Sequence, residues 1–267
     1  MRLRHFCYIF LLLVGVQTAS GRKIKLVDRK ATKETRALYK NLLQLQQRAV
    51  MFGHHDFPSY GIGWRGDKDR SDVITGDHPA VYSLDMHRIN DRKIEHIKEV
   101  YRRGGVSMLV WHQDNPLTEG PGQSYPKGTA WDNTPCVDQI LQEGSELNRK
   151  YCERLDKVAE ALHKMKDDDG KPIPVIFRPL HEHTQSWNWW GSSATTEEQF
   201  RAFWRFIVCY LRDKKDCHNV LYAISPQMDA EYEDADLISN VKKSHHEISI
   251  NSRERSTEKS NLTNTSF

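Results

Sequence analysis

Glu182 lies in the segment of this sequence that is best suited to chemistry. The segment covers residues 178–191 and reads RPLHEHTQSWNWWG. It places one carboxylic acid between two histidines, close to an arginine, and follows it with three tryptophans. A carboxylic acid beside apolar surface keeps its proton to a higher pH and can act as a general acid, while indole rings offer flat apolar faces to sugar rings. These residue types therefore predict a site that cleaves a sugar chain.

Several neighbours of Glu182 have expected roles in such a site. Arg178 would orient the acid, and His181 would hold the substrate or a second carboxylate. Trp187 and Trp190 would form an apolar pocket and a stacking platform. The alternative is a structural ion pair between Arg178 and Glu182, with the tryptophans in the core. The number of tryptophans directly after the acid favours the sugar site.

Two other motifs resemble metal sites, and we expect neither to bind a metal. His181 and His183 are spaced like a ligand pair, but hydrolases with such a pair carry it after their first strand, whereas here it follows the fourth predicted strand. The acidic run at 167–170 begins like a calcium loop. Pro172 and Arg178 occupy the positions at which that loop needs glycine and glutamate. The sequence therefore indicates no metal and no cofactor.

The chemistry-bearing segment follows a short run of β-branched and aromatic residues, which predicts a buried strand. Similar runs recur along the chain and alternate with helical repeats of apolar residues. This alternation is typical of a parallel sheet covered by helices. The predicted strands cover residues 50–55, 80–85, 106–112, 174–177 and 219–226.

Polar and aromatic residues recur where the predicted strands end, and a (β/α)8 barrel gathers such ends on one face. We therefore expect Trp111 and His112 to contact substrate beside Glu182. Trp131, on the following long loop, either packs that loop or forms another sugar platform. A doubly wound open sheet is the alternative fold. It would more often carry a glycine-rich turn after its first strand, and the sequence Gly-His-His at 53–55 is no such turn.

The alternating pattern stops after the fifth predicted strand. The 41 residues of 227–267 are largely polar, and one strand–helix unit takes roughly 30 residues. The sequence therefore predicts an incomplete (β/α)8 barrel of about five strand–helix units in residues 21–236. A polar tail at 237–267 has the composition of a disordered segment.

The N-terminal residues and the overall charge indicate where the protein acts. Residues 1–20 combine a basic start, a short apolar stretch and small residues, as a secretory signal does. An uncleaved membrane anchor is the alternative, although the stretch is short for a bilayer. The net charge of +3 falls close to zero without the signal, so no nucleic-acid partner is expected. We expect an exported monomer in the periplasm, at the cell surface or in the medium, with no membrane span in the mature chain.

The cysteines do not indicate a zinc site, because no two of them have the close spacing that zinc sites use. Four remain after the signal, and two interpretations are equally good. They form disulfides, with Cys136–Cys152 and Cys209–Cys217 the pairs nearest in sequence, or they are four free thiols.

Five motifs, in their order along the chain, resemble glycoside hydrolase family 26. They are FGHHD at 52–56, GIGW at 61–64, WHxxNP at 111–116, RPxHE at 178–182 and WxWWG at 187–191. The resemblance runs from about residue 35 to about residue 234. The best-known members of this family are endo-β-1,4-mannanases. The resemblance implies a (β/α)8 barrel and retaining hydrolysis of mannan, glucomannan or galactomannan.

The resemblance also implies roles for individual residues. Glu182 matches the acid/base of the family, while His112, His181 and Trp187 match residues that line the sugar subsites. Arg178 matches a position close to the acid/base. The nucleophile of the family is a glutamate at the end of the seventh strand, which this sequence does not contain. The later glutamates, at positions 231, 233, 247, 254 and 258, do not follow a suitable strand.

A retaining mechanism needs its second carboxyl group roughly 5 Å from the acid. We therefore predict little or no hydrolysis by the chain as written. Two alternatives remain open. In the first, the protein is a carbohydrate-binding pseudoenzyme. In the second, it is a family 26 hydrolase that acts on another β-glycan, such as β-1,3-xylan or mixed-linkage glucan.

Overall fold

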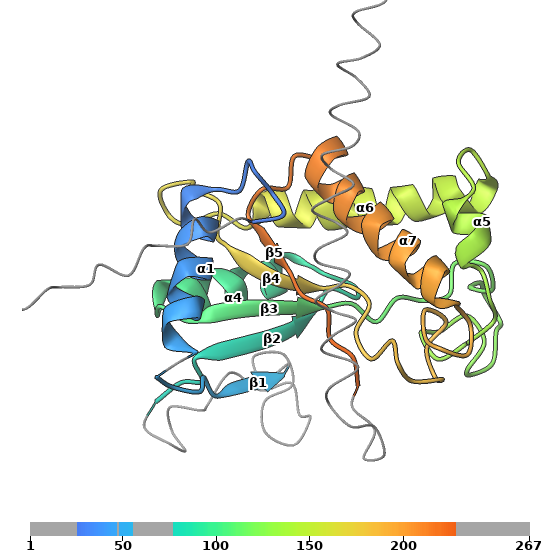
Figure 1. Cartoon of the computed structure of the whole chain (residues 1–267), viewed down its shortest axis with the longest axis horizontal. Coiled ribbons are helices and arrows are strands. Elements are labelled where there is room, and N and C mark those ends of the chain that lie inside the picture. The colour runs from blue at the N-terminus through green and yellow to red at the C-terminus, as the bar shows by residue number, and fades with distance from the viewer. Residues whose placement is uncertain (1–25, 47, 56–76, 228–267) are drawn as a thin grey trace, which may run out of the picture.

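The computed structural model describes residues 26–46, 48–55 and 77–227, and its centre is a parallel five-stranded sheet (Figure 1). Neighbouring strands in the sheet are also neighbours in the sequence. A doubly wound sheet reverses its strand order, so this order excludes that alternative and agrees with successive strands of a (β/α)8 barrel. The strands are β1 (Gly53–His55), β2 (Val81–Asp85), β3 (Val106–Val110), β4 (Val175–Arg178) and β5 (Val220–Tyr222).

Capping side chains determine where most of the helices begin. The helices are α1 (Lys33–Leu45), α4 (Asp91–Arg102), α5 (Val137–Leu141), α6 (Glu146–Lys164) and α7 (Glu197–Cys209), which continues into the π-helical turn η1 (Tyr210–Lys214). Thr32, Asn90, Ser145 and Thr196 each accept a hydrogen bond from a first-turn backbone N–H. Such caps satisfy N–H groups that have no partner within the helix.

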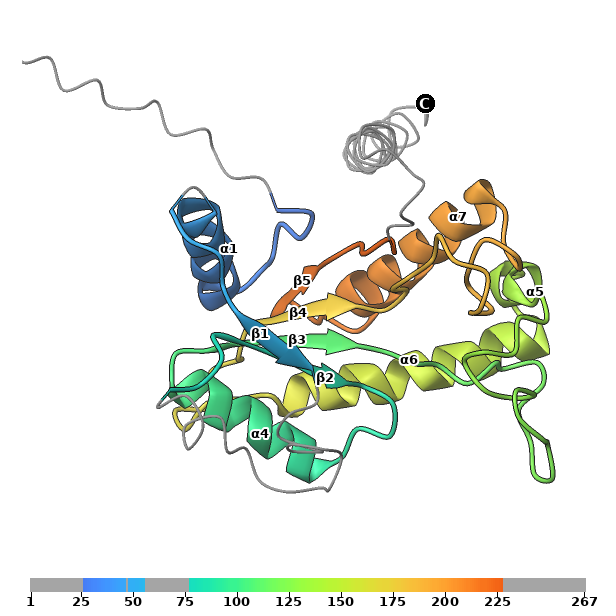
Figure 2. The same cartoon turned by 90° about the horizontal axis from the view of Figure 1, so that it is seen from below.

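One face of the sheet is covered by helices. Leu84, Leu109 and Phe177 are neighbours in the strand register, and each is fully buried. They belong to one apolar cluster with side chains of α4, α6 and α7. Figure 2 shows α4 and α6 on the same side of the sheet. Met108 and Ile176 alternate with these residues along β3 and β4, so they point to the opposite face, where they are only half-buried.

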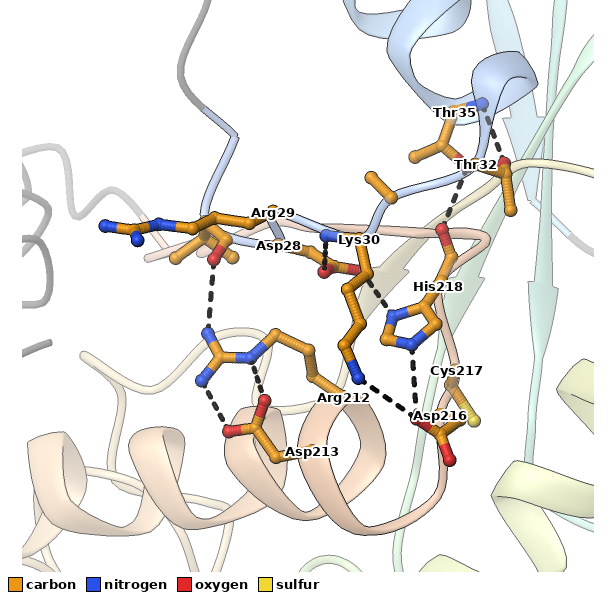
Figure 3. Close-up of polar contacts among 12 residues, drawn as sticks. Asp28, Arg29, Lys30, Thr32, Thr35, Arg212, Asp213, Asp216, Cys217 and His218 are labelled. Atoms are coloured by element: carbon orange, nitrogen blue, oxygen red, sulfur yellow. Dashed lines mark hydrogen bonds and ion pairs between the residues drawn. The ribbon is translucent and has the colours of Figure 1, made fainter. Parts of the chain in front are cut away.

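A polar cluster fixes the N-terminal segment against the loop before β5 (Figure 3). The imidazole of His218 contacts Asp28 Oδ2 at 2.9 Å through Nδ1 and Asp216 Oδ1 at 3.3 Å through Nε2. The backbone oxygen of His218 accepts hydrogen bonds from Thr32 N at 2.9 Å and from Thr35 Oγ1 at 3.3 Å. These contacts place the start of α1 at the amino end of β5, which leaves the carboxyl ends of the strands for the site.

Some expectations concern residues outside the described ranges. These are the signal at 1–20, the GIGW motif at 61–64, the glutamates at 231–258 and the tail at 237–267. Within the described ranges, no helix is long and apolar enough to cross a bilayer. Cys136, Cys152, Cys209 and Cys217 are free thiols, so the structure favours the second interpretation of the cysteines.

Candidate active site

The candidate site lies at the carboxyl ends of four neighbouring strands. Asp85 ends β2, His112 follows β3, Glu182 follows β4 and Ser225 follows β5. Parallel strands bring these ends to the same edge of the sheet, as the arrows in Figure 1 show. We call this edge the rim. Hydrogen bonds connect the four strand ends, so the rim is a continuous polar line.

Glu182 is fixed at the rim by its backbone and by its carboxylate. Its φ angle is 55°, in the left-handed region that non-glycine residues rarely adopt. Its N–H donates to the Ser225 carbonyl at 2.8 Å, and its Oε2 accepts the indole N–H of Trp187 at 3.0 Å. The side chain is half-buried. The carboxyl group is therefore held in one place, beside an apolar ring, and remains open to solvent.

Arg178 does not form the structural ion pair that the alternative interpretation requires. Its guanidinium donates to Ser225 Oγ and lies 3.4 Å from the sulfur of Met108. Burial lowers the pKa of Arg178, and the nearby charge of Glu182 acts in the opposite direction. Arg178 is thus close enough to influence the carboxylate electrostatically while its hydrogen bonds go elsewhere.

Asp85, His112 and His181 form a hydrogen-bonded series across three strand ends. The Nδ1 of His112 lies 2.7 Å from Asp85 Oδ2, and its Nε2 lies 3.1 Å from the Nε2 of His181. Burial raises the pKa of Asp85, but hydrogen bonds from His112 and His87 outweigh it and bring the pKa to about 2. Burial is the main cause that lowers the pKa of His181 to about 3, and the neighbouring His112 and Arg178 act in the same direction. Asp85 is therefore ionised and His181 neutral near pH 7.

Trp131 and Trp187 present aromatic surface at the site. Trp131 stacks on the ring of His112 with centroids 5.6 Å apart, and it is 44% exposed. Trp187 is 39% exposed and donates to Glu182. Large apolar side chains are usually covered, so two exposed indoles, one on His112 and one on Glu182, are consistent with a platform for a ligand. Both interpretations of Trp131 stay open, because its ring also lies 6.3 Å from that of Tyr125 on the same loop.

The positions of Trp111 and Trp190 differ from their predicted contact with substrate. Trp111 shares the strand alternation of Leu109, so it points to the helices and packs between Tyr151 and Phe177. Trp190 is fully buried, and its indole N–H donates to the backbone oxygen of His181 at 2.8 Å. Both side chains pack in the core behind the site and do not face a ligand.

His181 and His183 do not point to a common ligand. The ring of His183 stacks on Phe200 of α7, with centroids 4.1 Å apart, whereas His181 pairs with His112. Burial lowers the pKa of His183 to about 4. Residues 179–191 form turns and bends, so the two imidazoles are not presented side by side as they would be on an extended segment.

No role was predicted for Asp85, which ends a predicted strand, or for Gln113. The buried amide of Gln113 donates to the Pro179 carbonyl at 2.9 Å and accepts the hydroxyl of Tyr151 at 2.5 Å. The Gln113 backbone oxygen accepts the indole N–H of Trp189 at 2.9 Å. Gln113 therefore holds the turn that carries Glu182. The only available signal was its position directly after a strand-end histidine.

Comparison with known proteins identifies the family. The model of glycosyl hydrolase family 26 matches residues 27–237. A mannan endo-1,4-β-mannosidase of Bifidobacterium adolescentis is 30% identical over 228 residues, which are 79% of this chain and 22% of that protein. The enzyme of the same name from Bacillus subtilis strain 168 is 24% identical over 246 residues, 84% of this chain and 66% of that protein. The chain thus spans less than two thirds of each of these relatives.

Solved structures agree with this result. A family 26 β-mannanase from Bacteroides ovatus has 40% identity and a TM-score of 0.66, with 75% of this chain and 60% of that chain covered. A modular endo-β-1,4-mannanase from Cellulomonas fimi has 31% identity and a TM-score of 0.67, with 76% and 48% covered. The parallel sheet with alternating helices corresponds to part of their (β/α)8 barrel. This chain belongs to glycosyl hydrolase family 26.

Proposed function

We propose that this chain acts on β-1,4-mannan and that Glu182 is the acid/base residue of a retaining glycoside hydrolase site. The main support is the carboxylate of Glu182, which is held by the Trp187 indole at the rim, half-buried and outside any ion pair with Arg178. A general acid needs such a fixed carboxyl group within reach of the leaving oxygen. The relatives named mannan endo-1,4-β-mannosidase support β-mannan as the substrate.

In the proposed reaction, Glu182 donates its proton to the glycosidic oxygen as the bond to the anomeric carbon breaks. In the same step, a carboxylate nucleophile roughly 5 Å away must attack the anomeric carbon, and water then hydrolyses the glycosyl-enzyme intermediate with Glu182 acting as the base. Asp85 is the other carboxylate of the described rim, but both of its oxygens accept hydrogen bonds from His112. It is therefore poorly placed to attack a sugar. We infer that the 267-residue chain binds mannan and hydrolyses it slowly or not at all.

Calorimetric titration with mannohexaose tests the substrate class. Aromatic contacts contribute about 0.5–1.5 kcal/mol beyond buried area, so Trp187→Ala should weaken binding by about tenfold. Phe52→Ala is the matched control, because Phe52 is 70% exposed and precedes β1 at the opposite edge of the sheet. Tighter binding of xylo- or gluco-oligosaccharides would identify another β-glycan. No binding of any of the three would contradict a carbohydrate site.

Product analysis tests the role of Glu182. Any mannohexaose hydrolysis by the chain should disappear in Glu182→Gln, because the amide cannot donate a carboxylic proton. Binding should remain within a few fold, since the new amide keeps an oxygen that can accept the Trp187 indole N–H. Equal cleavage by both proteins would show that Glu182 is not the acid. Steady cleavage by the unaltered chain would show that a nucleophile is present and would leave the assignment of Glu182 intact.

A second candidate function is carbohydrate binding without cleavage. Both carboxylate oxygens of Asp85 accept hydrogen bonds, and this favours the second candidate, because the described rim then offers one available carboxylate instead of two. Mannohexaose binding that depends on Trp187, together with no product after long incubation, would support this candidate. Product formation that depends on Glu182 would exclude it.

Export of the protein is part of the proposal. Its support is the signal-like composition of residues 1–20 and the polymeric nature of the proposed substrate, which does not enter cells intact. Expression of the full chain in a secreting host, followed by N-terminal sequencing, should give a mature protein that starts near residue 21. An intact N-terminus on a membrane-associated chain would instead indicate an anchor.

A further inference from the structure

The hydrogen bonds of Asp85 restrict the protons on two histidines of the rim. Asp85 Oδ1 accepts the backbone N–H of His87 at 2.8 Å and of His112 at 3.1 Å. Oδ2 faces the Nδ1 of His112 at 2.7 Å. An ionised carboxylate only accepts hydrogen bonds, so Nδ1 of His112 carries the proton. Asp85 therefore determines that His112 carries a proton on Nδ1.

The contact between His112 and His181 leaves two arrangements of the remaining protons. The two Nε2 atoms are 3.1 Å apart, and one of them must donate to the other. In the first arrangement, His112 is neutral and its Nε2 accepts the Nε2–H of His181. In the second, His112 is an imidazolium that donates to Nε2 of His181, and the proton of His181 then lies on its Nδ1.

The surroundings of His181 select the first arrangement. Its Nδ1 is buried and has no hydrogen-bond partner among the described residues. The second arrangement would leave a buried N–H donor unpaired, and such donors are rare in proteins. It would also place a further positive charge against His181, which already faces Arg178 and His55 as well as Asp85. The first arrangement leaves only an unpaired acceptor and adds no charge.

We propose that Asp85 is a positioning residue that fixes the tautomers of two rim histidines: His112 carries its proton on Nδ1, and His181 donates its Nε2–H to His112. Neither ring is then a free donor, and both are neutral. The consequence for catalysis rests on the proposed function. A neutral pair beside Glu182 does not favour the ionised carboxylate, whereas an imidazolium there would lower the fraction of protonated acid.

Asp85→Asn tests the inference sharply, because the structure dictates how the new amide lies. The two backbone N–H groups that bond Oδ1 require an oxygen at that position. The amide NH2 must therefore replace Oδ2 and donate to Nδ1 of His112, which can no longer carry a proton. His112 should become the Nε2–H tautomer, and His181 should move its proton to Nδ1. A similar exchange of tautomer abolishes most activity in serine proteases.

Nitrogen NMR of the full chain with labelled histidine measures these protons directly, without substrate or activity. The 13 histidines are assigned by single His→Gln substitutions. In the unaltered chain at pH 7.5, we expect His112 protonated at Nδ1 and His181 at Nε2, and Asp85→Asn should exchange both. Asp156→Asn is the control, because Asp156 binds Tyr210 and Lys215 away from the rim, and it should change neither ring.

The unaltered chain alone decides the tautomers, even if Asp85→Asn does not fold. An Nε2–H tautomer or an imidazolium at His112 would overturn the inference, as would a folded Asp85→Asn variant with unchanged rings. These results do not depend on mannan hydrolysis. A chain that neither binds nor cleaves mannan but shows the expected tautomers would contradict the proposed function and leave the role of Asp85 intact.

Discussion

The two faces of the sheet differ in how their residues are used. Leu109, on the face toward the helices, is fully buried and belongs to the large apolar cluster. Met108, the preceding residue on the same strand, faces the other way, is half-buried and contacts the guanidinium of Arg178. The first face provides most of the apolar burial, and the second leads to the rim with Glu182. Stability and chemistry therefore depend on different residues of the same strands.

The largest expected effect comes from a matched pair of substitutions on β3. Leu109→Ala removes a fully buried side chain and should lower the free energy of unfolding by about 2–5 kcal/mol. Met108→Ala removes a side chain of similar size from the half-buried face and should cost clearly less. Urea denaturation of both variants measures the difference. Equal losses would show that both faces are packed alike, which would remove the contrast between them.

The pH dependence of stability tests the rim. The pKa of His181 is about 3 in the folded protein, below its ordinary value of 6.5, so the unfolded chain takes up a proton first as the pH falls. The contribution of His181 to the free energy of unfolding is fully present above pH 6.5 and is lost as the pH falls to about 3. The loss should amount to a few kcal/mol.

Denaturation of His181→Gln between pH 7 and pH 4 measures this contribution, and its stability should fall less steeply than that of the unaltered chain. His183→Gln is the control for burial alone, because His183 also has a lowered pKa but packs on Phe200 away from the rim. An unchanged slope in His181→Gln would mean that the pKa of His181 is the same in the folded and the unfolded protein, which would contradict its burial in the neutral form.

The smallest expected effect on stability is that of Glu182→Gln. Among the residues that the structure describes, the carboxylate makes one hydrogen bond, to Trp187, and no ion pair with Arg178, so its replacement removes little. The free energy of unfolding should change by no more than about 0.5 kcal/mol. A thermal melt compares the variant with the unaltered chain. A loss of several kcal/mol would indicate that Glu182 is a structural residue of the core.

Strands β2 to β5 were predictable because each lies in an apolar run, whereas β1 reads Gly-His-His and only the apolar residues before it indicated a strand. The order of the sheet followed from the alternation of strands with helices. The carboxyl-end position of Glu182, His112 and His181 followed from the same pattern. The orientation of the tryptophans did not, because composition cannot distinguish Trp187 at the surface from Trp190 in the core. Likewise, no local pattern connects Asp85 with His112, which are 27 residues apart and meet only through strand pairing.

The central claim is that Glu182 at the rim faces a bound mannan chain. A crystal structure of the full chain with mannohexaose tests it most directly. We expect a glycosidic oxygen within hydrogen-bond distance of the Glu182 carboxyl group and a sugar ring against Trp187. A sugar bound elsewhere, or a Glu182 side chain turned away and paired with Arg178, would contradict it.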